Sequence, residues 1–144
     1  MAKWNKTTFL TSAKDKCEPR VQTVILDMVR FAEKYADQVS WGRGEGYGTM
    51  TFKCKSDDYG VIPLFHITTN GQIKFQLNYL RQKIRGKEIL RDYQLKLESN
   101  FMMDFGKDVY PSDLYHQMGD LFTIKIEVDK FVQTIQGIAH RLRQ

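Results

Sequence analysis

Residues 61–80 read VIPLFHITTNGQIKFQLNYL, in which two largely apolar runs flank the dipeptide Asn70-Gly71. Asn-Gly is the preferred centre of a two-residue hairpin turn, because both positions tolerate a positive φ. Such a turn pairs His66 with Phe75 and Ile67 with Lys74. The stretch therefore predicts an antiparallel hairpin. Its outer face would carry Phe65, Ile67, Lys74, Gln76 and Asn78, and its core face Ile62, Leu64, His66, Thr68, Ile73, Phe75, Leu77 and Tyr79.

Apolar residues at spacings of three and four predict helices on both sides of this hairpin. Residues 18–39 form the first helix, with a proline in its first turn, where the missing N–H costs nothing. Residues 88–105 form the second, which Gly106 ends. Ser112 is expected to cap a short helix and Asp129 the last one. The buried stripe of that last helix would be Phe131, Val132, Ile135, Ile138, Ala139 and Leu142.

Alternating apolar residues predict further strands. Residues 39–41 end one strand, residues 49–54 form the next, and residues 121–128 form another after the second helix. The last would turn Phe122, Ile124, Ile126 and Val128 inward. Strands in a meander with helices left over predict an α+β fold. We expect a mainly antiparallel sheet of about four to five strands with helices packed on one face.

The chain has 144 residues and a formal net charge of +5, with 42% hydrophobic and 27% charged residues. This composition predicts one α+β domain at residues 19–144, preceded by an N-terminal arm at residues 1–18 that is either loose or a short helix. No apolar run is long enough to cross a bilayer, and the N-terminal stretch lacks the apolar core of a signal peptide. We expect a cytoplasmic protein without membrane contact, in which Cys17 and Cys54 are free thiols.

The glycine-rich stretch at residues 40–55, SWGRGEGYGTMTFKCK, raises the question of phosphate binding. A Walker loop or a dinucleotide fingerprint opens a helix, whereas this stretch leads into a strand. Kinase chemistry needs an HRD-type catalytic loop, which the chain lacks although it contains Asp-Phe-Gly at residues 104–106. Two interpretations remain open, a plain surface hairpin and a ligand-binding loop. The residues of the ligand-binding loop would be Trp41, Arg43, Glu45 and Tyr47.

The segments VSWGRGEGYGTMTFKC and PLFHITTNGQIKFQLNYL resemble parts of small bacterial α+β domains of unknown function. In those domains a Trp-Gly-x-Gly turn leads into a strand and then into a hairpin. Some of them stand alone, and others are fused to nuclease or defence-related proteins. The resemblance covers roughly residues 21–142, and its distinctive parts are Trp41–Gly48 and Phe65–Leu80. It implies an α+β fold and a bacterial or phage context, and it brings no catalytic residues.

The sequence predicts no catalytic residue, no metal ligand and no cofactor. His66, His116 and His140 lie far apart without metal-ligand spacing. Cys54 and His66 would be neighbours on adjacent strands, so a Cys–His dyad is one alternative, although a buried thiol is inert. The nuclease pattern (D/E)xK fails at Glu127, because one residue too many precedes the lysine.

Positive charge is the strongest functional signal. Between residues 81 and 91 there are five basic residues and one acidic residue, and the outer sheet face adds lysines beside an aromatic ring. Such surfaces hold phosphates and stack bases, so we expect a small module that binds nucleic acid or another polyanion. Its contacts would be Lys53, Phe65, Lys74, Arg81, Lys83, Arg85, Lys87 and Arg91.

Two alternatives to this binding module stay open. In the first, Phe65, Ile67 and Trp4 form a protein-interaction surface, either for another protein or for a second copy of the chain. In the second, the chain is an enzyme with a cleft beside Arg43, Glu45 and Tyr47. Enzymatic activity is the less favoured interpretation, because no catalytic pattern is met.

Overall fold

The computed structural model describes residues 3–106 and 112–144. Within these residues the strands form one antiparallel sheet in the order β1-β2-β3-β4-β5. The strands are β1 (Gln38–Trp41), β2 (Thr49–Ser56), β3 (Gly60–Thr68), β4 (Gln72–Lys74) and β5 (His116–Gln117). The helices are α1 (Lys6–Lys16), α2 (Pro19–Tyr35), α3 (Leu77–Lys83), α4 (Lys87–Phe101), α5 (Met118–Leu121) and α6 (Lys125–Arg143). The predicted α+β class is confirmed.

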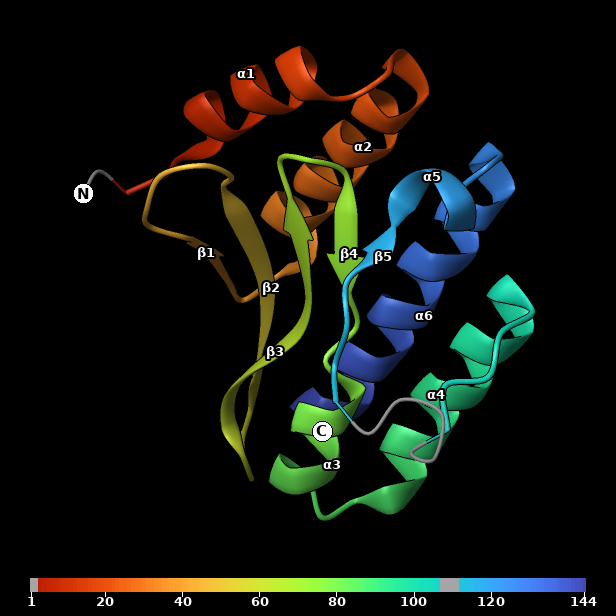
Figure 1. The fold of residues 1–144 in the computed structure, drawn as a ribbon. Coiled ribbons are helices and arrows are strands. Elements are labelled where there is room, and N and C mark those ends of the chain that lie inside the picture. Colours follow the sequence, from red (N-terminus) through yellow and green to blue (C-terminus); the bar gives the residue numbers. More distant parts are fainter. Residues whose placement is uncertain (1–2, 107–111) are drawn as a thin grey trace.

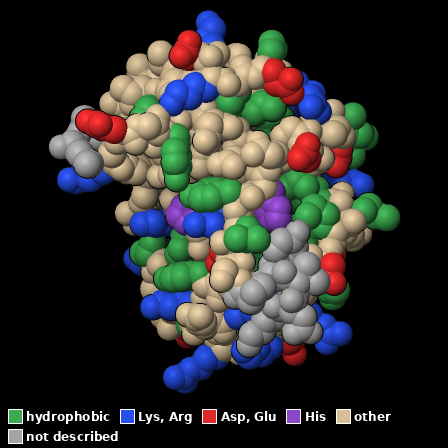
Figure 2. All heavy atoms as spheres, in the orientation of Figure 1, with side chains coloured by type: hydrophobic (Ala, Val, Ile, Leu, Met, Phe, Trp, Pro, Cys, Tyr) green, Lys and Arg blue, Asp and Glu red, His purple; other side chains and the backbone are tan. Residues whose placement is uncertain are grey.

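One face of the sheet is covered by helices and the other is open. In Figure 1, α2 and α6 lie behind the sheet, and α4 lies beside α6. The opposite face points toward the viewer and is drawn as spheres in Figure 2. None of the described helices combines the length and the apolar character that a membrane crossing requires.

The register of the β3–β4 hairpin differs from the prediction by one residue. His66 pairs with Lys74 and Ile67 pairs with Ile73. The reason is a three-residue loop, Thr69–Gly71, in place of the expected two-residue turn, with Gly71 at φ 82°. Because a shift of one residue moves side chains to the other face, Phe65, His66 and Ile67 of β3 lie on the faces opposite to those predicted. The β4 residues keep their predicted faces, with Ile73 in the core and Lys74 outside.

A β-bulge in β3 ends this exchange, so that Ile62 and Leu64 lie in the core as predicted. Phe52 pairs with Phe65 but Lys53 pairs with Pro63, so Leu64 has no partner in the ladder. Leu64 and Phe65 both point into the core, and both are 0% exposed. The predicted outer-face positions of Phe65 and Ile67 and the predicted core position of His66 are therefore wrong.

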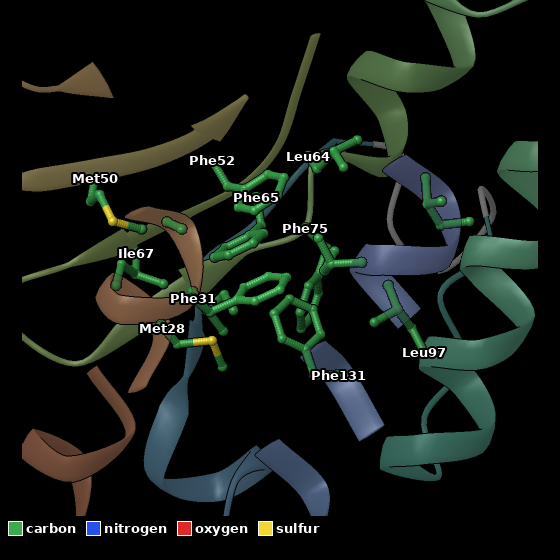
Figure 3. Close-up of a cluster of buried hydrophobic side chains, with 14 of the residues drawn as sticks. Met28, Phe31, Met50, Phe52, Leu64, Phe65, Ile67, Phe75, Leu97 and Phe131 are labelled. Carbon is green, nitrogen blue, oxygen red and sulfur yellow. The ribbon is translucent and has the colours of Figure 1, made fainter. Parts of the chain in front are cut away.

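The core lies between the sheet and α2 with α6. A chain of aromatic contacts crosses it, with ring centroids 5.2 Å apart for Phe31 and Phe52, 5.4 Å for Phe52 and Phe65, and 5.1 Å for Phe65 and Phe131. Figure 3 shows these rings between strand and helix. Most of the predicted apolar stripe of the last helix is buried here, which confirms that helix.

The predicted strand at residues 121–128 is wrong, because α6 already begins at Lys125. Ile124 and Ile126 are each 58% exposed instead of facing the core. The hydroxyl of Thr123 donates to the Glu127 carboxylate, which ties the first turn of the helix. The alternating apolar residues at the end of this stretch therefore belong to the first turns of α6 and not to a strand. Asp129 lies inside the helix instead of capping it.

Three further boundaries differ from the prediction. Strand β4 ends at Lys74, and the backbone turns at Gln76 (φ 59°) into α3, which leaves Tyr79 39% exposed. Helix α4 ends at Phe101 with Met102 in the left-handed region, five residues before the expected Gly106. Ser112 begins no helix, since the next element is β5, and the preceding residues 107–111 lie outside the described part.

The N-terminal arm contains helix α1. The Asn5 side chain accepts a hydrogen bond from the Thr8 backbone and caps this helix. Phe9 is 0% exposed, and its ring centroid lies 5.4 Å from that of Trp41. Helix α1 therefore packs against the end of β1 and contributes to the core.

Candidate functional site

The open face of the sheet, hereafter the outer face, gathers polar and basic side chains from three strands. Side chains alternate along a strand, so residues paired across the ladder share a face. Thr51 pairs with His66 and His66 with Lys74, while Lys53 lies two residues beyond Thr51 on the same face. Figure 2 shows histidine and basic side chains close together on this face.

His66 lies at the centre of the outer face and is half-buried. Its Nδ1 atom shares a hydrogen bond with the Thr51 hydroxyl. Burial first, and then the positive charges of Lys74 and Lys53, lower the pKa of His66 to about 4, against a smaller opposing effect of Asp113. The imidazole is therefore neutral at neutral pH.

Two tyrosines lie beside these groups. The Lys74 ammonium lies 4.5 Å from the centroid of the Tyr115 ring, a cation–π contact. Burial raises the pKa of Tyr115, and the nearby Tyr47 raises it further. The glycine-rich loop therefore brings Tyr47 to the edge of the outer face, where it is 47% exposed.

Asp113, the carboxylate that opposes the lowering of the His66 pKa, already has partners. Asp113 accepts hydrogen bonds from the backbone N–H groups of Asn78 at 2.8 Å and Tyr79 at 3.0 Å. It thereby holds the first turn of α3, which has no cap of its own. This carboxylate offsets only part of the positive charge on the outer face.

Four of the predicted basic residues are exposed and follow the connection from α3 to α4. We define Lys83, Arg85, Lys87 and Arg91 as the basic strip. Lys83 and Arg85 line a hollow together with Asp58 and Tyr59 of the β2–β3 turn. The Tyr59 hydroxyl accepts from the backbone N–H groups of Arg85 and Gly86, each at 3.1 Å, and so joins this turn to the basic strip.

Two predicted contact residues do not belong to this surface. Phe65 is buried in the core, as described above. The Arg81 guanidinium donates to the Gln94 side chain at 2.7 Å and to the Phe105 carbonyl at 2.9 Å. Arg81 therefore joins α3 to α4 and to the segment after it, and its charge is engaged in structure.

The glycine-rich loop is held by the N-terminal segment. Trp4 donates from its backbone to Gly42 at 2.9 Å and from its indole to Gly44 at 3.0 Å. The Lys16 ammonium donates to the Gly46 carbonyl at 2.6 Å. A Cβ atom at Gly48 would lie 2.6 Å from the Trp4 ring, so only glycine permits this contact. The loop is therefore clamped at three of its carbonyls.

The side chains predicted for a ligand-binding loop do not form one group. Trp41 is half-buried against Phe9, whereas Arg43 and Glu45 are exposed. Of the four residues, Tyr47 is the one that lies beside the outer face, through its proximity to Tyr115. A ligand role for the others stays a prediction.

The Cys54–His66 dyad is excluded by the sheet itself. Cys54 pairs with Ile62 and points into the core, where its thiol donates to the Ala139 carbonyl at 3.6 Å. Burial raises the pKa of Cys54 to about 11. His66 points to the opposite face. Within the described residues, no group of three or more His, Cys, Asp or Glu side chains could hold a metal ion.

Tyr115 and Asp113 were not found by sequence reasoning, because the stretch 110–118 was predicted to contain a short helix capped by Ser112. The sequence did contain a signal for the correct face of His66, in the residues of the turn that follows it. Thr-Thr-Asn-Gly also fits a three-residue loop whose last position is a left-handed glycine, and that loop places His66 beside Lys74.

Comparison with protein-family models, with curated proteins and with solved structures finds no match to this chain.

Proposed function

We propose that this chain is a nucleic-acid-binding module that holds a single strand across the outer face and along the basic strip. One observation carries the proposal. Lys53 and Lys74 flank His66 on an open sheet face, and neither lysine forms an ion pair with any carboxylate of the described residues. Unpaired ammonium groups on a sheet suit the phosphates of a nucleic-acid backbone.

The aromatic rings favour a single strand over a duplex. Tyr47 and Tyr115 lie at the edge of the outer face, where unstacked bases would reach their rings. A paired duplex hides the faces of its bases, and it is read by a helix or a ribbon inserted into a groove. The resemblance to α+β domains that accompany nucleases is retained as part of this proposal.

The residues predicted to form a hydrophobic protein-interaction surface are not available at the surface. Phe65 and Ile67 are 0% exposed, and the Trp4 indole is bonded to the glycine-rich loop. A surface for a protein partner would need other side chains. The basic outer face is therefore the better supported binding surface.

The first test is the double substitution Lys53→Glu with Lys74→Glu. We expect roughly tenfold or greater loss of affinity for a fluorescein-labelled oligodeoxythymidine, measured by fluorescence anisotropy near 0.1 M salt. The slope of log K against log salt should shrink by about 1.4, because each phosphate contact with a single strand contributes about 0.7.

The matched control is Lys14→Glu with Lys130→Glu, which changes the net charge equally on α1 and α6. This control should keep most of the affinity and of the salt slope. Equal losses in both double variants would show that only net charge matters. That result, or no binding by the wild-type chain at low salt, would contradict the proposal.

A further inference from the structure

His66 lies where a phosphate held by the neighbouring lysines would contact its ring. It lies on β3 between Lys53 on β2 and Lys74 on β4, with all three side chains on the outer face. Its Nδ1 atom is engaged by Thr51, while no described residue forms a hydrogen bond to its Nε2 atom. The Nε2 atom of this half-buried ring is therefore free to donate a hydrogen bond. An anion held by the two lysines would be placed to accept it.

We propose that Lys53, Lys74 and His66 form one phosphate subsite, and that a phosphate bound there places a proton on His66. In assigning this phosphate to a nucleic acid, the inference rests on the proposed function. The subsite itself would take any accessible phosphate-like oxyanion. The consequence is a module that binds its ligand more tightly as the pH falls.

The electrostatics of the empty site oppose protonation of His66. Lys53 and Thr51 face the ring from β2, Lys74 faces it from β4, and Asp113 and Tyr115 come from the segment before β5. Two like charges and partial burial disfavour the imidazolium, and Asp113 is already bonded to the start of α3. A bound anion would offset both lysines and accept a hydrogen bond from Nε2.

The sign of the pH effect follows from linkage. The pKa of His66 in the free chain is about 4, and an anion beside the ring raises it. Binding then takes up a proton at any pH between the free and the bound pKa. In that window the affinity rises by up to about tenfold for each unit that the pH falls, and above the bound pKa it is constant.

The first experiment uses the wild-type chain and sulfate, a dianion that does not titrate in this range. The ring signals of the three histidines are followed by NMR against pH, in sodium sulfate and in sodium chloride of equal ionic strength. The titration midpoint of His66 should move upward by about one unit or more in sulfate. An unchanged His66 midpoint would overturn the inference.

The second experiment measures binding of labelled oligodeoxythymidine from about pH 8 to about pH 5, where thymine keeps its charge. Wild-type affinity should increase roughly twofold or more between about pH 8 and about pH 5 at constant salt. His66→Gln should bind as wild type at high pH and lose this increase. His140→Gln, at the exposed end of α6, should retain it.

The two proposals fail separately. If sulfate shifts the His66 midpoint but the oligonucleotide does not bind, the subsite stands and the nucleic-acid function fails. If the oligonucleotide binds with the same pH dependence in wild type and His66→Gln, the function stands and the subsite is overturned. The sulfate titration needs no substitution, so a folding defect in a variant cannot obscure it.

Discussion

Tyr93 supports the β-bulge from the helical side of the core. Its hydroxyl donates to the Leu64 carbonyl at 3.0 Å, and the side chain is 0% exposed. Leu64 is the residue that the β2–β3 register skips, and Tyr93 supplies a hydrogen-bond partner for its carbonyl. The bulge in turn keeps Phe65 in the core and His66 on the outer face.

Tyr93→Phe should destabilise the chain by about 1–3 kcal/mol, because a buried carbonyl loses its partner without any change in packing shape. Urea unfolding followed by circular dichroism measures the change. Tyr79→Phe is the matched control on a 39% exposed tyrosine, and it should leave the midpoint in place. Equal midpoints for Tyr93→Phe and wild type would show that the bulge does not need this hydrogen bond.

At the scale of elements, α6 is the helix that spans the core and contacts both β2 and α4. Gly137 lies in its interior, where an added Cβ would meet nothing closer than the Lys96 ammonium at 3.9 Å. Glycine is a poor helix former because it loses more backbone freedom on folding than alanine does.

Gly137→Ala should therefore raise the free energy of unfolding by about 0.5–1 kcal/mol. The same substitution at Gly71 should have the opposite sign. There the backbone has φ 82°, and an added Cβ would lie 3.2 Å from Val21. Thermal unfolding of both variants tests the pair, and a lowered midpoint for Gly137→Ala would contradict the packing described for α6.

At the scale of the whole molecule, the two thiols report on different parts of the fold. Cys17 is half-buried between α1 and α2, and its thiol donates to the Thr69 carbonyl at 3.3 Å. Cys54 is 0% exposed beneath α6, and burial raises its pKa to about 11. Thiolates react whereas thiols do not, so both exposure and pKa protect Cys54.

A maleimide reagent should label Cys17 in the native chain and Cys54 only when the molecule unfolds. In Cys17→Ser, the labelling rate should rise with urea in parallel with global unfolding, as followed by mass spectrometry. Fast labelling of Cys17→Ser without denaturant would mean that α6 separates locally from the sheet.

The helices and the α+β class could be predicted from the sequence because their signals are local. The apolar stripe of α6, including Phe131 and Ile135, repeats over many turns, so a boundary error of five residues leaves the helix intact. The lysines of the basic strip were found for the same reason, since an uncompensated charge cluster is visible in sequence and stays at the surface.

The sequence by itself determined that this chain forms helices over a meander and carries excess positive charge. Only the tertiary structure decided which side chains share the outer face. A strand has a period of two, so one more loop residue at Thr69–Gly71 moves Phe65, His66 and Ile67 to the opposite faces. The bulge at Leu64 confines this change to the end of β3 next to the loop. That change buries Phe65 and places His66 between Lys53 and Lys74, which is the arrangement on which both proposals depend.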